Sequence, residues 1–190
     1  MKIKLTSELK GKVKHFDTSH CEIHIVDYSE KTKFERGVEV CDSKPEDIDS
    51  LKLINDAKHQ ITTTVFEDNC FLDESKKAIP HCEGIVYPSN VSFESWILFV
   101  EIKDCKPKNI SRYFEKAKSQ IIETVKIFRT SHFIHPDRKV HAVISFPQKN
   151  KADFYHHLIK QGERQNFLHQ HKIIIKATNC MTIKSKKVII

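Results

Sequence analysis

Two residues of opposite charge follow an apolar run in the stretch WILFVEIKDCK, residues 96–106. The acid Glu101 and the base Lys103 are one residue apart, and a second acid, Glu83, opens the segment EGIVYP 18 residues before Glu101. Neighbouring carboxylates raise each other's pKa unless a cation lies between them. Mg²⁺ prefers such oxygen ligands and bridges to phosphate, and a nearby lysine can orient water or neutralise charge on the phosphate. If Glu83 and Glu101 meet, the three residues could therefore hold a divalent cation and a phosphate.

The geometry of an extended strand decides which of these side chains can meet. Alternate residues of a strand share a face, so Glu101 and Lys103 lie on the same face, about 6.6–7 Å apart along the chain. Both faces of the run are apolar at its start, which is typical of a central, buried strand. If the Glu83 segment pairs with this strand as an antiparallel hairpin, Glu83 lies near Glu101 at the rim of the sheet. The alternative is that Glu101 and Lys103 have reached solvent or pair with one another, and that Glu83 is an ordinary edge carboxylate.

The rest of the chain predicts an α/β protein that positions this pair of strands. Alternating or β-branched apolar residues predict strands, and apolar residues three or four apart predict helices. The middle of the chain is predicted to run helix, three strands, helix, strand, over residues 43–60, 61–66, 82–87, 96–104, 110–129 and 139–146. Irregular β structure with strands at 21–26 and 38–40 precedes it, and a helix at 152–170 and two strands joined around Thr178 and Asn179 follow it. The strand–helix–strand crossover implies a central mixed sheet with flanking helices.

The acid, the hairpin, the acid-x-lysine pair and the following basic helix resemble the PD-(D/E)xK nuclease superfamily, which has the restriction-endonuclease-like fold. The resemblance covers a little over half of the chain, and its motifs are short. It implies an αβββαβ core over about residues 43–147. A β extension at 1–42 and a helix and β segment at 150–190 complete a single predicted domain of residues 1–190.

Site residues are carried over from the resemblance by position. Glu83 takes the place of the first acid, Glu101 and Lys103 are the (D/E)xK pair, and Gln120 matches a glutamine that many members carry on the following helix. The resemblance implies that Glu83 and Glu101 bind Mg²⁺ or Mn²⁺. It also implies that Lys103 orients the attacking water or stabilises the transition state, and that Gln120 positions the metal-bound water or the phosphate. The alternative for Gln120 is a surface glutamine.

The glutamate at position 83 leaves two functions open, because the first acid of the superfamily is usually aspartate. One function is a divalent-metal-dependent nuclease that cleaves DNA, in repair or phage defence. The other is a catalytically inactive module of the same fold that binds nucleic acid or a protein partner. Asp73 is the alternative first acid, and Glu46 is a further acid that could join the site from the first predicted helix.

The charge of the chain suits a polyanionic partner. The formal net charge is +7, from 32 lysines and arginines against 25 acids, and a basic surface favours nucleic acid. Four basic residues after the acid-x-lysine pair are expected to hold a DNA backbone: Lys106, Lys108, Arg112 and Lys116. The alternative is a solvated helix face. The sequence leaves open a homodimer or another protein partner.

Several other classes of protein are disfavoured. The chain lacks the glycine-rich phosphate loops of nucleotide-binding proteins, and its 6 cysteines and 12 histidines show no zinc-ligand spacing. The chain has no apolar run of the roughly 18 residues that a membrane helix needs, and the N-terminus lacks the apolar region of a signal peptide. The sequence therefore predicts a cytoplasmic protein without a membrane partner.

Overall fold

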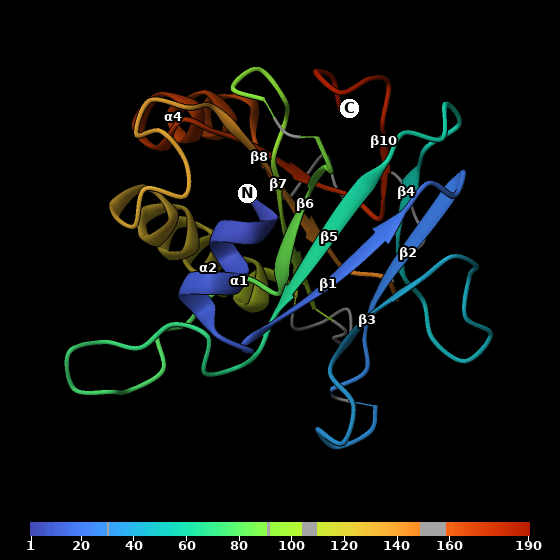
Figure 1. Cartoon of the computed structure of the whole chain (residues 1–190), viewed down its shortest axis with the longest axis horizontal. Coiled ribbons are helices and arrows are strands. Elements are labelled where there is room, and N and C mark those ends of the chain that lie inside the picture. The colour runs from blue at the N-terminus through green and yellow to red at the C-terminus, as the bar shows by residue number, and fades with distance from the viewer. Residues whose placement is uncertain (30, 91, 104–109, 149–158) are drawn as a thin grey trace.

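The structure is a computed structural model, and it describes residues 1–29, 31–90, 92–103, 110–148 and 159–190. Figure 1 shows the arrangement of its helices and strands. The helices of the described residues are α1 (Lys2–Leu9), α2 (Ile110–Thr130) and α4 (Gln161–His171). The strands are β1 (Val13–Thr18), β2 (Glu22–Asp27), β3 (Val38–Cys41), β4 (Leu51–Ile54), β5 (Ile61–Phe66), β6 (Gly84–Pro88), β7 (Leu98–Ile102), β8 (Val140–Ser145), β9 (Ile173–Ala177) and β10 (Cys180–Thr182).

The strands form two mixed sheets, so the predicted α/β class with a mixed sheet is confirmed. The larger sheet has six strands in the order β1-β5-β6-β7-β8-β9. Strands β1, β5, β6 and β7 pair antiparallel with their neighbours, whereas β7, β8 and β9 run parallel. The smaller sheet has the order β10-β4-β2-β3. Helix α2 connects β7 to β8, because parallel neighbours need a crossover.

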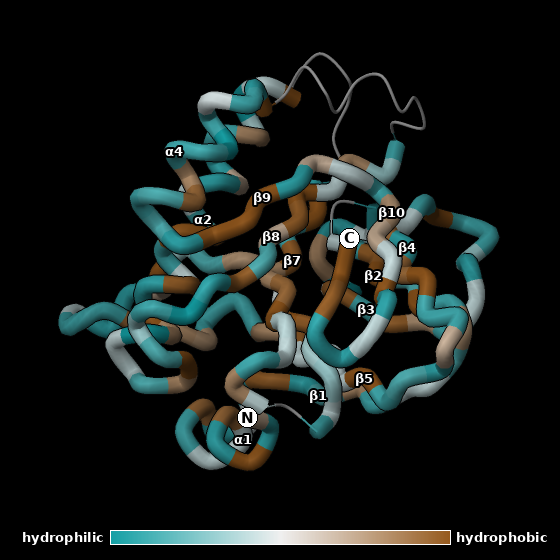
Figure 2. The backbone as a smooth tube through the Cα atoms, turned by 90° about the horizontal axis from the view of Figure 1, so that it is seen from above, coloured by the Kyte–Doolittle hydropathy of each residue, from teal (hydrophilic) through white to brown (hydrophobic). Residues whose placement is uncertain are grey.

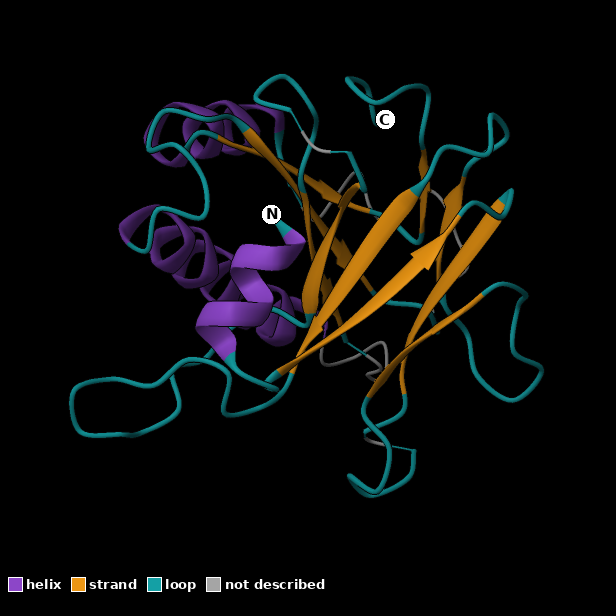
Figure 3. Ribbon diagram, viewed as in Figure 1, coloured by secondary structure: helices purple, strands orange, loops and turns teal. Residues whose placement is uncertain are grey.

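The six-stranded sheet lies between the helices and the four-stranded sheet, as Figure 3 shows. The apolar cluster on the helix side includes Leu5, Ile85, Phe99, Phe114, Ile121, Phe128 and Phe167. The cluster between the two sheets includes Ile23, Leu51, Leu53, Val86, Leu98, Val100 and Ile102. Seen from above, hydrophobic residues gather along β7, β8 and β9, whereas α4 is mostly hydrophilic (Figure 2). Strand β7 is therefore central and buried on both faces, as its sequence predicts.

The predicted helix at residues 43–60 is wrong, because this region contains strand β4. Leu51 and Leu53 point into the core between the sheets, and Lys52 and Ile54 are only partly buried. This period of two suits a strand with one buried face. Ile48, Leu51 and Ile54 also fit a helical spacing, and such short apolar runs are ambiguous in isolation. Pairing with β2 on one side and β10 on the other decides for the strand.

Other elements differ from the prediction at the two ends of the chain. The N-terminal segment forms helix α1 and strand β1, which the sequence analysis missed, and β1 joins the larger sheet beside β5. Of the predicted helix at 152–170, residues 152–158 lie outside the described residues, residues 159–160 are not helical, and α4 (Gln161–His171) forms the rest. The two predicted strands around Thr178 and Asn179 are confirmed, but β9 and β10 belong to different sheets. In the part of the chain that the structure describes, no helix is long and apolar enough to span a membrane.

Candidate functional site

Glu83 and Glu101 lie at the same end of the β6–β7 pair. The pairing of these strands ends at Gly84 and Val100, so each glutamate is one residue beyond the last paired position. Alternation along each strand places Glu83 on the side of Ile85, and Glu101 on the side of Phe99, which is the side covered by α2. Both glutamates therefore follow apolar core residues onto the same face of the sheet.

Lys103 joins the two carboxylates. Its Nζ lies 2.5 Å from Oε1 of Glu101 and 3.4 Å from Oε1 of Glu83. The two carboxylate oxygens are therefore separated by no more than the sum of these distances, about 5.9 Å. The side chain of Glu101 has no exposed area, and those of Lys103 and Glu83 are 15% and 22% exposed. We call these three residues the Glu–Glu–Lys cluster; the sequence had predicted that they meet.

Main-chain bonds fix the positions from which the cluster projects. The backbone of Glu83 lies between two strands: its N–H donates to the carbonyl of Val100 and its carbonyl accepts from Phe66. The N–H of Lys103 donates to the carbonyl of Ser145, at the end of β8. Neighbouring strands thus hold the backbone at both ends of the cluster.

Burial changes the proton affinity of the cluster. The pKa of Glu83 is raised to about 7 and that of Glu101 to about 8, mainly through loss of solvent, and the charge of Glu83 contributes to the rise at Glu101. Lys103 opposes both effects. Burial alone would lower the pKa of Lys103, but attraction by Glu101 and Glu83 outweighs it and raises that pKa. Near neutral pH the carboxylates therefore bind protons that a divalent cation could replace.

The donor set fits a divalent cation with oxygen ligands. Among the described contacts, Oε2 of Glu101 has no hydrogen-bond partner, whereas Oε1 lies 2.5 Å from the ammonium group of Lys103. A buried oxygen without a partner is costly, and a cation at Glu83 and Glu101 would satisfy it. No group of three histidines, cysteines or acids among the described residues is arranged to hold a metal. The site therefore offers two carboxylates, which suits Mg²⁺ because this ion keeps several of its waters.

Gln120 lies on α2 and contacts the segment that precedes Glu83, and it is buried rather than a surface residue. Its Nε2 donates to the carbonyl of His81, at 2.7 Å, two residues before Glu83. Its Oε1 is buried without a hydrogen-bond partner among the described residues. One turn further along α2, the hydroxyl of Thr124 accepts from the N–H of Cys82. Helix α2 thus fixes the segment that carries Glu83.

Asp27 is a third acid near the cluster that the sequence analysis missed. It ends β2 in the smaller sheet and is 8% exposed. Its negative charge raises the pKa values of Glu83, Glu101 and Lys103. The signal was present in the segment EIHIVD, where an acid ends an apolar strand as Glu101 does. Only the packing of the two sheets brings the two strand ends together.

The other predicted residues do not join the cluster through any described contact. Arg112 and Lys116 are exposed on α2, and Lys106 and Lys108 lie outside the described residues. The carboxylate of Asp73 accepts from the N–H groups of Ser75 and Lys77 in its own turn, and Glu46 is exposed near a loop. Asp73 therefore does not replace Glu83, and Glu46 does not join the cluster as a further acid through any described contact.

Without a metal, the stability of the protein is expected to depend on pH through the cluster. The pKa values of Glu83 and Glu101 in the folded protein exceed the ordinary 4.5. Between about pH 5 and 8 the folded state thus binds more protons than the unfolded state, and this contribution to stability falls as pH rises. Other groups titrate in the same range, so the measurement is the difference in Tm, with chelator, between wild type and Glu101→Gln across this range. Equal pH dependence of the two proteins would contradict the raised pKa.

Comparisons of the chain with protein-family models, with curated proteins and with solved structures found no match.

Proposed function

We propose that the protein is a divalent-metal-dependent nuclease that hydrolyses phosphodiester bonds, with DNA as its substrate. The observation that carries this proposal is the buried Glu–Glu–Lys cluster at the end of two central strands. Metals at the end of a sheet need ligands that are fixed before binding, and the backbone bonds of Glu83 and Lys103 supply that rigidity. Perturbed carboxylates with a charged partner are also common at catalytic sites.

The order of elements supports a restriction-endonuclease-like core. The segment β5–β6–β7–α2–β8 follows the expected βββαβ order, with β7 and β8 parallel. The expected helix before these strands does not come from residues 43–60. Instead, α1 from the N-terminus contributes Leu5 to the same apolar cluster as α2. We therefore propose that α1 takes the place of the first core helix.

Each residue of the cluster has a distinct proposed role. Glu83 and Glu101 would hold Mg²⁺ or Mn²⁺, which supplies an activated water and polarises the phosphate. Lys103, held by both carboxylates, would move its ammonium group toward the phosphate as charge develops there. Gln120 acts through the carbonyl of His81 and is thus a positioning residue, and its free Oε1 is the atom that could orient water.

A second function is favoured by one specific observation. Lys103 contacts both carboxylates, so the cluster is already partly neutralised without a metal. A cluster of this kind could serve as the structural centre of an inactive module that binds nucleic acid or a protein partner. Such a module would bind DNA without cleaving the DNA backbone, whether or not a divalent metal is present.

The test is cleavage of plasmid DNA and single-stranded DNA with Mg²⁺, with Mn²⁺ and with chelator. We expect cleavage with metal only, and a loss of roughly 10²–10⁴-fold in Lys103→Met. Lys52→Met is the matched control, because Lys52 forms an ion pair of 2.5 Å with Glu22 in the other sheet. Cleavage that persists in chelator or in Lys103→Met would refute the proposed site. Binding without cleavage under all conditions would favour the inactive module.

A further inference from the structure

The loop between β2 and β3 carries an exposed aromatic side chain in an unusual backbone conformation. Phe34 is 73% exposed, and its φ is 68°, next to Lys33 with a φ of 51°. Bulky residues rarely adopt a positive φ, and such strain persists only where the surroundings enforce it. The conformation of Phe34 therefore needs an explanation.

Backbone hydrogen bonds enforce this conformation. The N–H of Phe34 donates to the carbonyl of Ser29 at 2.8 Å, and the N–H of Tyr28 donates to the carbonyl of Gly37 at 3.2 Å. The N–H of Thr32 donates to the carbonyl of Tyr28 at 2.9 Å. These hydrogen bonds close the loop and define the backbone conformation at its tip.

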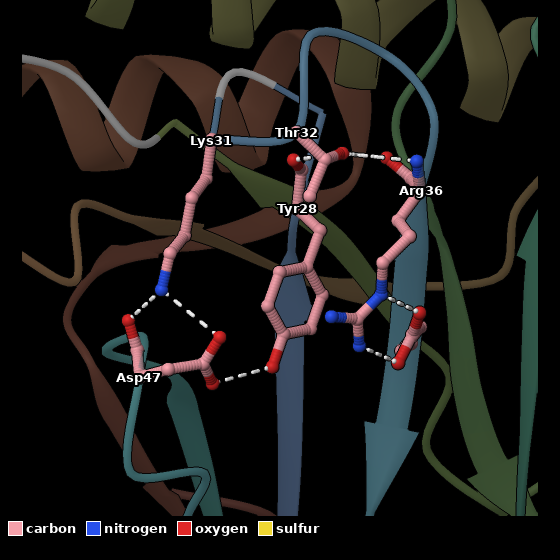
Figure 4. Close-up of polar contacts among 6 residues, drawn as sticks. Tyr28, Lys31, Thr32, Arg36 and Asp47 are labelled. Atoms are coloured by element: carbon pink, nitrogen blue, oxygen red, sulfur yellow. Dashed lines mark hydrogen bonds and ion pairs between the residues drawn. The ribbon is translucent and has the colours of Figure 1, made fainter.

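Side chains brace the same loop from both sides (Figure 4). The guanidinium of Arg36 lies 3.5 Å from the centre of the Tyr28 ring and also pairs with Glu39. The Tyr28 hydroxyl donates to Asp47 at 2.9 Å, and Lys31 forms an ion pair with the same carboxylate at 2.9 Å. The loop is thus tied to β3 and to the segment before β4, and it holds the Phe34 ring out in solvent.

The braced loop starts where β2 ends, at the same end of the molecule as the Glu–Glu–Lys cluster (Figure 1). Tyr28 directly follows Asp27, whose charge acts on Glu83, Glu101 and Lys103. In Figure 1 the loop projects from the lower end of the strands, the end at which β6 begins and β7 finishes. A polymer bound at the cluster could therefore extend along this loop.

The chemistry of the loop tip suits one kind of ligand. Lys31 and Arg36 are neutralised by Asp47 and Glu39, whereas Lys33 makes no ion pair with any residue that the structure describes. An exposed ring beside a lysine matches a base and its phosphate, because bases stack on aromatic faces while cations hold the backbone. A single ring among charged residues offers little of the apolar area that a protein interface needs.

We propose that Phe34 is a stacking platform for an unpaired base of a single-stranded nucleic acid whose backbone reaches the Glu–Glu–Lys cluster. This inference rests on the proposed function, because it assigns the class of substrate at the same site. It identifies the described part of the braced loop, residues 28, 29 and 31–37, as the part of the protein that selects a single strand over a duplex.

The test measures binding in chelator, so it does not depend on cleavage. Fluorescent single-stranded DNA of about 20 nucleotides, the same RNA sequence and the DNA duplex are titrated with wild type, Phe34→Ala and Phe93→Ala. Phe93 is the matched control, because it is 70% exposed but lies in the β6–β7 connection, at the other end of these strands. In Phe34→Trp, the intrinsic tryptophan fluorescence is followed during the same titrations.

We expect Phe34→Ala to weaken binding of single strands by roughly 5- to 140-fold, as expected for one stacked base, with Phe93→Ala unchanged. Single strands should quench the fluorescence of Phe34→Trp. Unchanged binding by Phe34→Ala, or an absence of any binding by wild type, would overturn the inference. An equal loss on the duplex would overturn the assignment to an unpaired base, and a changed oligomeric state with unchanged binding would assign the ring to a second copy. If wild type binds single strands through Phe34 but cleaves no DNA when metal is present, the proposed nuclease activity is refuted and the proposed stacking role of Phe34 is not.

Discussion

Substitution of Glu101 by glutamine is expected to reduce metal-dependent cleavage by roughly 10²–10³-fold, the usual effect of removing one stabilising group from a charged transition state. Glutamine has nearly the same shape as glutamate but cannot offer a carboxylate to a cation. Glu101 is fully buried at the end of β7, so no other side chain can take its position without rearrangement of the sheet. The measurement is the initial rate of plasmid nicking with Mg²⁺ and with Mn²⁺.

Two controls separate a catalytic role of Glu101 from a structural one. Glu22→Gln removes the acid of the other 2.5 Å glutamate–lysine pair and should leave cleavage unchanged. Binding of Mn²⁺, measured by calorimetry, should weaken in Glu101→Gln in parallel with activity. If Glu101→Gln folds and cleaves like wild type, the cluster is not a metal centre.

Replacement of Gly84 by alanine is expected to give the largest loss of stability. A Cβ at Gly84 would lie 2.3 Å from the carbonyl oxygen of Thr64, and its next neighbours are also backbone atoms of β5. Backbone in the middle of a sheet cannot move aside as a side chain can, so β5 and β6 would separate. Overpacking of this kind costs about 1–3 kcal/mol or more, and thermal denaturation should show a fall in Tm of roughly 2–12 °C for a chain of this size.

Gly162 provides the matched control for this substitution. It lies in α4, and a Cβ there would have no neighbour within 4 Å. Gly162→Ala should therefore raise stability by about 0.5–1 kcal/mol through a better helix propensity. Because Gly84 follows Glu83 directly, Gly84→Ala should also lower cleavage. A Tm equal to that of wild type would contradict the close approach of β5 and β6.

The sequence was sufficient to predict the strands of the core and three residues of the site. Strands β5, β6, β7 and β8 are short and buried, and their β-branched and aromatic residues signal them locally. The Glu–Glu–Lys cluster followed from alternation and from one assumed hairpin, β6–β7, because both glutamates stand at the ends of paired strands. That hairpin is present, so the local sequence patterns and the pairing of two neighbouring strands are sufficient to predict that the three side chains meet.

Features that depend on distant contacts were not predictable in this way. The local sequence predicts a helix where β4 forms, because nothing near Leu51 reveals its partners β2 and β10. The approach of Asp27 to the cluster needs two sheets to pack face to face, which one strand cannot indicate. The stretch KIKLTSEL alternates in sequence but forms α1, whose Leu5 is buried against the sheet. In each case tertiary packing overrides a weak local preference.

The two sheets are interleaved along the chain, and this has a consequence for folding. The chain enters the six-stranded sheet at β1, builds β2 to β4 in the other sheet, returns at β5 and leaves again at β10. Lys52 of β4 pairs with Cys180 of β10, so a very long loop must close before the smaller sheet gains its last strand. The chain loses conformational entropy when such a loop closes, before the contacts that stabilise the closed form are made, and this slows folding. Neither complete sheet comes from one continuous stretch of chain, so no single cut in the chain would release one sheet intact.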